Sequence, residues 1–326
     1  MRKANGLLFI GDPHVSSRKP GRRRDEKYAS TILSKVEYAI SVANERKLIP
    51  IFLGDMHDSA VETDEGVKTR LIRILCDAWT KPISNVGNHD IRNTTLTTGD
   101  TLKMYAEAGV LVVADKSGPV ETVMIGDKVV GIGATPYGQS WPTDARPLFG
   151  EVDTIIWLTH HDIAFENPYP GSIAPTSIAG CRLVVNGHIH LHKNPVRVLK
   201  TLWMNPGNIT RQTVDTMDHD PAVWELTADS KFNKIRIPHE KGVFDLTGKL
   251  VDPIAQEQVS EQATETLAES EFVNLLSADS PMEMNKSDDG SILKEEIEEK
   301  FERENTPHDV RTLILHLHAE ATSLND

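Results

Sequence analysis

Cysteine, long apolar runs and internal repeats are all scarce or missing in this 326-residue sequence. Two cysteines cannot build a disulfide framework, and they do not indicate a zinc site made of thiolates. No apolar run approaches the roughly 20 residues that a membrane-spanning helix needs. The basic start, MRKANG, precedes an apolar run that is too short for a signal peptide. These absences argue against disulfide-rich and membrane-spanning proteins and predict a cytoplasmic location.

Basic charge is not in excess either, but the acidic charge is unevenly distributed. The whole chain has a net charge of −13. Residues 251–326 contain 19 acidic and 5 basic residues, whereas residues 1–250 contain 29 acidic and 30 basic residues. The body of the protein is therefore almost neutral, and its C-terminal part is acidic. A polyanionic ligand is not excluded from the body.

Short apolar runs alternate with amphipathic stretches through most of residues 1–240. The run at 7–12 precedes a helical pattern over 27–47, and the run at 48–55 precedes a second helical pattern. The run at 82–90 precedes a short helix that stops at Gly109. Further apolar runs occur at 110–113, 120–125, 128–134, 154–159, 182–186, 195–199 and 223–228. The pattern predicts an α/β fold with two stacked mixed β-sheets flanked by helices.

The composition changes near residue 250, which predicts three parts of the chain. Residues 1–240 form the predicted globular domain, residues 241–290 an acidic linker that can contain a short helix, and residues 291–326 an amphipathic helical segment. Helices of this length seldom persist alone in water, so we expect their apolar faces to dock on the body or on a partner. The docking candidates are Leu293, Ile297, Phe301, Leu313 and Leu317.

Polar side chains that can bind metals follow five of the predicted strands. In LVVNGHIH, residues 183–190, two histidines two positions apart leave the end of a strand on the same side. The other strand ends read GDPH, GDMHD, GNHD and LTHHD. Because ligand sites of open α/β sheets form where the carboxyl ends of strands converge, the five ends can build one site. The candidate ligands are Asp12, His14, Asp55, Asn88, His160, His188 and His190.

The types of these side chains narrow the chemistry of the site. Oxygen and imidazole ligands without thiolate favour manganese, iron, zinc or magnesium. One aspartate can bridge two ions, and a pair of ions about 4 Å apart acts on phosphate esters. Within LTHHD, either His160 or His161 can be the ligand on these grounds.

The ordered motifs D-x-H, G-D-x-x-D, G-N-H-D, an apolar run ending in His, and G-H-x-H resemble those of the calcineurin-like metallophosphoesterases. The resemblance spans residues 11–190 and implies a metallophosphoesterase catalytic domain, a four-layer sandwich that hydrolyses phosphate esters. It also selects His160 over His161. By this resemblance, one ion is held by Asp12, His14 and His190, the other by Asn88, His160 and His188, and Asp55 bridges the two.

The remaining motif residues receive roles from the same resemblance. His89 stabilises or protonates the leaving oxygen, and Asp90 orients His89. Asp58, the second aspartate of GDMHD, shapes its loop. The implied cofactors are two divalent ions, with Mn²⁺ favoured and Mg²⁺, Fe²⁺ or Zn²⁺ as alternatives.

Within that superfamily, the chain looks most like nuclease subunits of the SbcD type, including phage recombination exonucleases. The similarity lies in the Arg-rich loop after GDPH, in GDMHDS, in NPGN followed by TRQ at 205–212, and in the acidic helical tail. It implies a DNA exonuclease or endonuclease subunit used in recombination, repair or replication, and an SbcC-type coiled-coil ATPase bound through the C-terminal helices. Homodimers are common in the family. The candidate DNA-backbone contacts are Arg18, Lys19, Arg22, Arg23 and Arg24, with a solvated surface loop as the alternative.

One departure from the SbcD pattern keeps a second function open. Such proteins usually carry a small capping domain after the phosphoesterase body, but here only EKGVFDLTGKLVDPI separates the last predicted strand, 231–237, from the tail. The alternative is a stand-alone phosphodiesterase or phosphatase that acts on nucleotides or other small phosphate esters. A metal-binding scaffold without turnover is disfavoured, because every ligand position of the family is retained.

Overall fold

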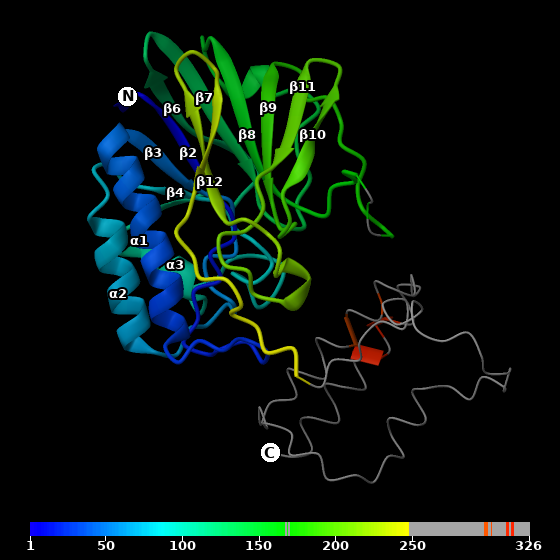
Figure 1. Ribbon diagram of the computed structural model, residues 1–326. Helices are drawn as coiled ribbons and strands as arrows, with labels where there is room; N and C mark the ends of the chain where they lie inside the picture. The colour runs from blue at the N-terminus through cyan, green and yellow to red at the C-terminus, as the bar shows by residue number, and fades with distance from the viewer. Residues whose placement is uncertain are drawn as a thin grey trace, which may run out of the picture.

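The computed structural model describes residues 1–247, apart from Asn167 and Tyr169, and seven residues of the tail. Residues 1–247 fold as an α/β unit with two mixed β-sheets and three α-helices (Figure 1). The described tail residues, all helical, are Ile297, Glu298, Phe301, Arg311, Thr312, Ile314 and Leu315.

The strands form a sheet of six and a sheet of seven. In spatial order, the six-stranded sheet consists of β13 (Phe232–Arg236), β12 (Ala222–Thr227), β2 (Gly6–Ile10), β3 (Leu48–Phe52), β4 (Ile83–Ser84) and β5 (Val112–Val113). The seven-stranded sheet consists of β1 (Lys3–Ala4), β6 (Gly118–Ile125), β7 (Lys128–Thr135), β8 (Thr154–His160), β9 (Cys181–Gly187), β11 (Thr201–Asn205) and β10 (Lys193–Val198). The helices are α1 (Tyr28–Arg46), α2 (Glu65–Cys76) and α3 (Thr101–Glu107), with short 3₁₀ turns η1 (Arg146–Leu148) and η2 (Val214–Thr216).

The alternation of side chains along β2 shows how the layers are stacked. Leu7 and Phe9 pack in the core that also contains residues of the seven-stranded sheet, so this core lies between the two sheets. Leu8 and Ile10 pack on the opposite face, in the core shared with the helices. Because successive strand residues point to opposite faces, a strand buried on both sides reads as a continuous apolar run.

The three helices cover the outer face of the six-stranded sheet (Figure 1). α1 buries Ile32, Val36 and Ile40, which are spaced four residues apart on one face of the helix. The start of α2 is capped by Asp64, whose side chain accepts a hydrogen bond of 2.9 Å from the N–H of Val67.

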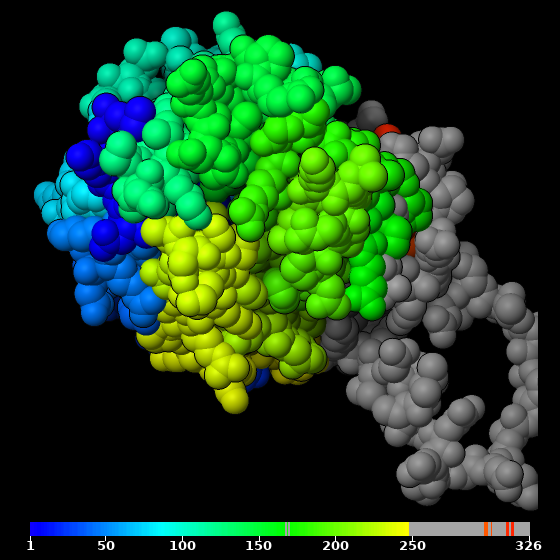
Figure 2. Space-filling view, turned by 90° about the horizontal axis from the view of Figure 1, so that it is seen from above, coloured from blue at the N-terminus to red at the C-terminus, as the bar shows by residue number. Residues whose placement is uncertain are grey.

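The outer face of the seven-stranded sheet has a different cover. Trp157 and Trp203 on this face pack against Ala145, Phe165 and Ile178, which lie in connecting segments outside the named helices and strands. The expected flanking by helices therefore holds for the six-stranded sheet. The outer face of the seven-stranded sheet is covered by connecting segments, one of which contains the short 3₁₀ turn η1. Figure 2 shows the yellow β12–β13 hairpin on the surface between the blue N-terminal segment and the green strands.

The strand registers bring the functional loops to one edge of the molecule. β2, β3 and β4 run parallel, with Ile10 opposite Phe52 and Phe52 opposite Ser84. β8 and β9 also run parallel, with His160 opposite Gly187. Residues that follow these strands therefore emerge next to one another.

The body extends past the predicted domain boundary at residue 240. Val243 and Phe244 are buried against Val214, and the N–H of Arg24 donates a 2.8 Å hydrogen bond to the carbonyl of Val243. Residues 241–247, predicted to belong to the linker, thus pack on the body. Among the described residues, no helix has the length and apolar character needed to cross a bilayer.

Only part of the predicted docking face lies within the described tail residues. Leu293, Leu313 and Leu317 lie outside them, while Ile297 is half-buried. Phe301 is only 5% exposed; its carbonyl accepts a 3.0 Å hydrogen bond from Arg311, whose guanidinium lies over its ring. Phe301 is therefore buried within the chain, and docking of the C-terminal helices on a partner stays a prediction.

Candidate metal centre

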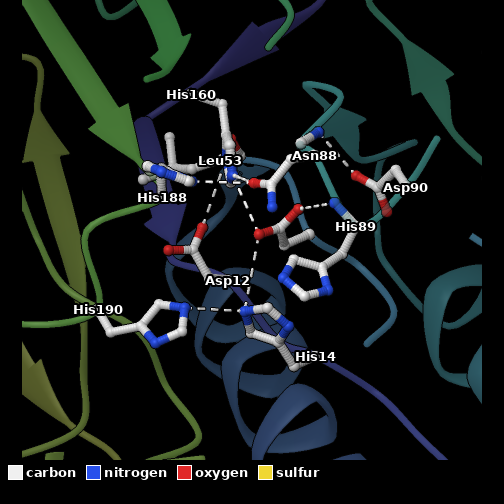
Figure 3. A network of polar contacts seen from close by, with 12 residues as sticks. Asp12, His14, Leu53, Asn88, His89, Asp90, His160, His188 and His190 are labelled. Atoms are coloured by element: carbon white, nitrogen blue, oxygen red, sulfur yellow. Dashed lines mark hydrogen bonds and ion pairs between the residues drawn. The ribbon is translucent and has the colours of Figure 1, made fainter. Parts of the chain in front are cut away.

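The five strand ends bring their polar side chains together at one edge of the two sheets (Figure 3). In that view the side chains turn inward from separate segments and are joined by short polar contacts. The first three segments follow strands of the six-stranded sheet, and the other two come from β8 and β9. The side chains are Asp12 and His14 after β2, Asp55 after β3, Asn88 after β4, His160 at the end of β8, and His188 and His190 after β9.

A first set contains Asp12, His14 and His190. The Nε2 atoms of His14 and His190 lie 3.0 Å apart, so two ring nitrogens face the same small volume. Both carboxylate oxygens of Asp12 are buried and accept no hydrogen bond from the residues that the structure describes. Buried carboxylates are normally paired or bound to a metal, so these oxygens indicate a cation-binding site.

A second set contains Asn88, His160 and His188. The side-chain oxygen of Asn88 lies 2.9 Å from His188 Nδ1 and 3.2 Å from His160 Nε2. The outer nitrogen of His160, Nδ1, donates to the carbonyl of Leu53 at 3.0 Å, which leaves the Nε2 lone pair directed into the set.

Asp55 lies between the two sets. Its Oδ2 atom is 3.1 Å from His160 Nε2 and 3.7 Å from His14 Nε2. Its Oδ1 atom accepts a 2.8 Å hydrogen bond from the N–H of His89. One carboxylate oxygen thus faces a histidine of each set, as an aspartate that bridges two cations must.

The backbone at the site is strained in a consistent way. Asp12, His14, Asp55 and His188 all have positive φ, between 32° and 75°. Aspartate, asparagine and histidine are the non-glycine residues that enter this region most readily, and such strain gathers at functional sites.

Close packing at Gly87 leaves no room for a side chain beside the central carboxylate. A Cβ atom on Gly87 would lie 2.0 Å from Asp55 Oδ1 and 2.5 Å from the backbone nitrogen of Asp55. Only glycine lets the GNHD loop approach Asp55 this closely.

The electrostatics of the site are those of buried carboxylates held among imidazoles. Burial opposes ionisation of Asp55, but His160 and His14 hold its pKa far below the usual range. Burial alone would lower the pKa of His160, yet Asp55 and Asp12 raise it to about 9. Burial and the neighbouring His14 lower the pKa of His190 well below its usual value. The carboxylates therefore favour positive charge at their centre, while His190 stays neutral and able to bind a metal.

His89 lies beside the two sets, and the structure changes the predicted role of Asp90. His89 Nδ1 donates to the carbonyl of Asp58 at 2.7 Å, and its ring meets that of His14 edge to face. The two oxygens of Asp90 accept hydrogen bonds from the N–H groups of Met56 (3.0 Å) and Gly87 (2.9 Å). Asp90 therefore fixes the loop backbones, and the Asp58 carbonyl, not Asp90, orients His89.

Two further carboxylates reach the site: Asp58, which was predicted only to shape its loop, and Asp162, for which no role was predicted. Asp58 Oδ1 lies 3.6 Å from His14 Nδ1, and Asp162 Oδ2 lies 3.2 Å from His188 Nε2. Both aspartates belong to the strand-end motifs GDMHD and LTHHD. The sequence could therefore predict that they lie near the site, but not which histidines they face. Two compact groups could hold a metal ion by donor spacing: one is Asp55, His160 and His188, and the other is His14, Asp58 and His89.

The alternative ligand His161 points elsewhere. Its Nε2 atom lies 2.9 Å from the carbonyl of Gln139, and its ring stacks on Tyr137. His160 faces the second set instead, and its role as the ligand stays a prediction.

Two of the predicted DNA contacts are structural. Arg22 and Arg23 are 7% and 2% exposed. Arg23 pairs with Asp25 at 2.7 Å and donates to the carbonyl of Thr210 at 3.0 Å, while Arg22 donates to the carbonyl of Asp245 at 3.3 Å. The prediction that Arg22 and Arg23 bind a DNA backbone is wrong, because their guanidinium groups are engaged inside the protein.

The other basic residues of the same loop remain at the surface. Arg18 and Lys19 are exposed. The Arg24 side chain is 59% exposed and pairs with Asp245 at 3.3 Å. The loop thus presents Arg18, Lys19 and Arg24 to solvent.

Comparisons with known proteins identify no family for this chain. No protein-family model matches the sequence, and no curated protein matches it. Among solved structures, a hypothetical protein from Thermus thermophilus is similar with 11% identity and a TM-score of 0.39, over 71% of this chain and 99% of that chain. The function must therefore be argued from the site.

Fold and site together define an α/β protein with histidine and aspartate groups that could hold metal ions. The donor set fits hard or borderline divalent cations: carboxylate and amide oxygens with imidazoles, and no thiolate among the described side chains at the site. The orphaned oxygens of Asp12 and the facing nitrogens of His14 and His190 support the same conclusion.

Proposed function

We propose that the protein is a two-metal phosphodiester hydrolase of the calcineurin-like type, built on a four-layer metallophosphoesterase sandwich. The observation that carries the proposal is Asp55, whose Oδ2 atom faces a histidine of each set. Mn²⁺ is the favoured ion, given the mixture of oxygen and imidazole donors. One ion would be held by Asp12, His14 and His190 and the other by Asn88, His160 and His188, with Asp55 placed to contact both.

The chemistry that two divalent cations supply in such a site is charge stabilisation on the phosphoryl oxygens and activation of water as the nucleophile. The protein supplies rigid placement. Gly87 allows the loop that carries Asn88 to pack on Asp55, and the hydrogen bonds of Asp90 hold that loop to the one after β3. Displacement of reacting groups by 1 Å can cost about 100-fold in rate, so this fixed backbone matters for turnover.

His89 is the proposed acid for the leaving group. Since its Nδ1 proton is donated to the carbonyl of Asp58, only Nε2 is available to the substrate. Nε2 carries a proton to donate only when the ring is doubly protonated. The imidazolium then gives its Nε2 proton to the departing oxygen, a contribution of about 10²–10⁴ in rate.

For the substrate, we propose DNA, with the protein acting as the nuclease subunit of an SbcCD-type complex. Support comes from the exposed Arg18 and Lys19, which follow closely on Asp12 and His14 and can hold a phosphate backbone near the reaction centre. The partner is an SbcC-type ATPase bound through the C-terminal helices.

A small-ester hydrolase is the second candidate, and two observations favour it. Arg22 and Arg23 serve the protein interior, which leaves fewer free cations for a long polyanion. Residues 237–247, after β13, pack back on the body, so this stretch does not contribute to a separate cap.

The test of this function uses metal-stripped protein reloaded with Mn²⁺. Substrates are linear duplex DNA, single-stranded DNA and bis-p-nitrophenyl phosphate, each with and without the cognate ATPase. We expect manganese-dependent hydrolysis of the ester and of DNA. Hydrolysis of the ester without cleavage of any DNA would select the small-ester alternative, and no hydrolysis of any substrate would refute both.

Two variants distinguish the proposed acid, His89, from a proposed metal ligand, Asp55. His89→Ala should keep both manganese ions and lose turnover, whereas Asp55→Ala should lose manganese as well. His239→Ala is the matched control, since His239 is half-buried outside the site and bonds to the carbonyl of Ile237. Equal loss of manganese in the His89 and Asp55 variants would remove His89 from the acid role.

A further inference from the structure

The segment Asn205–Gln212, NPGNITRQ, leaves the end of β11 and runs beside the first set; we name it the clamp turn. Its closest partner is the GHIH segment. The side-chain nitrogen of Asn205 donates to the carbonyls of Ile189 (2.7 Å) and Leu191 (3.0 Å), and the N–H of Asn208 donates to the carbonyl of His190 (2.8 Å). Three consecutive carbonyls centred on His190 are thus held by one turn.

The clamp turn also reaches the loop after β2, which carries Asp12 and His14, and the loop after β3, which carries Asp58. The N–H of Ile209 donates to the carbonyl of Gly11 at 3.1 Å, next to Asp12. The side-chain nitrogen of Gln212 donates to Asp58 Oδ1, and this same oxygen lies 3.6 Å from His14 Nδ1. Every ligand-bearing loop of the first set is therefore bonded to this segment, directly or through Asp58.

Two buried basic side chains hold the clamp turn in place from behind. Lys35 Nζ donates to the carbonyls of Ile209 (3.0 Å) and Thr210 (3.1 Å). Arg23 donates to the carbonyls of Thr210 (3.0 Å) and Arg211 (2.6 Å). Lys35 and Arg23 are 3% and 2% exposed, so these bonds are shielded from water.

The second set is oriented by different groups. His160 is held by the carbonyl of Leu53, and His188 Nε2 faces Asp162. The Oδ1 atom of Asn205 accepts a 3.1 Å hydrogen bond from Asn186, whose amide also holds the backbone of His161. A change at Asn205 would therefore disturb both sets, whereas Gln212 acts on the first set through Asp58.

We propose that the clamp turn positions the first metal set, and that Gln212 is a positioning residue that acts through Asp58 on His14. The proposal rests on the two-metal function above. Asp58 Oδ1 faces His14 Nδ1 at 3.6 Å, longer than a hydrogen bond, and a carboxylate on that side favours the tautomer in which the lone pair of Nε2 points to the cation. Gln212 fixes the carboxylate in that place. Partners of this kind change metal affinity by about 10–100-fold when removed.

The test is a titration of the metal-free protein with Mn²⁺, followed by calorimetry and by electron paramagnetic resonance, with thermal unfolding in parallel. Gln212→Leu removes the amide donor at nearly constant size, and Gln212→Glu places an acceptor against Asp58. Gln139→Leu is the matched control, because Gln139 is a half-buried glutamine that holds Ser117 and the Asp115 carbonyl instead. His190→Ala and His188→Ala assign the two dissociation constants to the first and second set.

We expect both Gln212 variants to raise the dissociation constant of the first set by about 10-fold and that of the second by less than about twofold, with unchanged thermal unfolding of the metal-free protein. The control should leave both constants unchanged. Equal weakening of both sets, or no weakening in either, would overturn the role of the clamp turn while leaving the two-metal function intact. Failure of the unmodified protein to bind two Mn²⁺ ions would instead refute the proposed function itself.

Discussion

Gly87→Ala tests the claim that a close backbone approach places the central carboxylate. The new Cβ atom would lie 2.0 Å from Asp55 Oδ1 and 2.5 Å from the backbone nitrogen of Asp55, whereas ordinary contacts begin at 3.4 Å. Relief of the first contact alone requires a movement of about 1.4 Å, and the second contact is with backbone, so a simple rotation of the Asp55 side chain cannot provide it. The 2.8 Å hydrogen bond from the N–H of His89 to Asp55 Oδ1 would be lost or lengthened by the same movement.

The expected result is a large loss of function. Since displacement by 1 Å costs about 100-fold in rate, we expect kcat/KM on bis-p-nitrophenyl phosphate to fall by at least about 100-fold. Manganese affinity should fall too, because Asp55 faces both sets. Gly150→Ala is the control, since a Cβ atom on Gly150 has no neighbour within 4 Å. A Gly87→Ala protein with normal turnover and normal metal affinity would refute the reasoning about Asp55.

Three further predictions follow from the described contacts. Burial lowers the pKa of Lys35 to about 7 from its usual 10.5. Between these two pH values the amine is protonated in the unfolded chain but not in the folded protein. The free energy of unfolding therefore rises with pH from about 7 to 10.5. The rise amounts to at most about 4 kcal/mol between pH 7 and 10, measured by urea unfolding, and Lys35→Met should abolish it. An unchanged slope of the free energy of unfolding against pH in the variant would contradict the burial of the amine. Combined Arg18→Ala and Lys19→Ala substitutions should reduce the salt dependence of DNA binding, measured by filter binding, by about two phosphate contacts. Arg23→Ala should instead lower the unfolding temperature, measured by calorimetry. A reduced salt dependence in the Arg23 variant with an unchanged unfolding temperature would restore Arg23 as a DNA contact. Removal of metal by a chelator should lower the unfolding temperature, and readdition of Mn²⁺ should raise it again, with a stabilisation that grows with the logarithm of the metal concentration above the dissociation constant. An unchanged temperature would contradict metal binding by the folded state.

The elements of the fold were largely predictable because they depend on local pattern. The apolar stripe of the first predicted helix, with Ile32, Val36 and Ile40, is buried in α1. The runs that end in Asp12 and Asp55 became β2 and β3, whose continuous apolar sequence reflects burial on both faces. β11 was not predicted, because a five-residue strand that follows another closely carries no separate signal.

The assembly of the site was predictable for a similar reason. Parallel strands place their carboxyl ends together, so residues far apart in sequence, such as Asp12 and His188, could be expected to meet once the strands were known. The residues alone left His160 and His161 as alternatives and the resemblance selected His160; in the structure the ring of His160 faces the second set and that of His161 faces the carbonyl of Gln139.

The errors concern contacts between segments that no local pattern joins. Arg23 reads as a surface arginine in a basic loop, but its guanidinium meets carbonyls almost 190 residues away along the chain. Asp90 adjoins His89 in sequence, yet its oxygens bind the backbone of Met56 and Gly87. The partnership of Gln212 with Asp58 likewise depends on how β11 and β3 are placed in different sheets.

Anomalous diffraction from crystals soaked in manganese tests the two-ion centre most directly. We expect two anomalous peaks on either side of Asp55, one among Asp12, His14 and His190 and one among Asn88, His160 and His188. Absence of both peaks, or manganese bound away from Asp55, would contradict it.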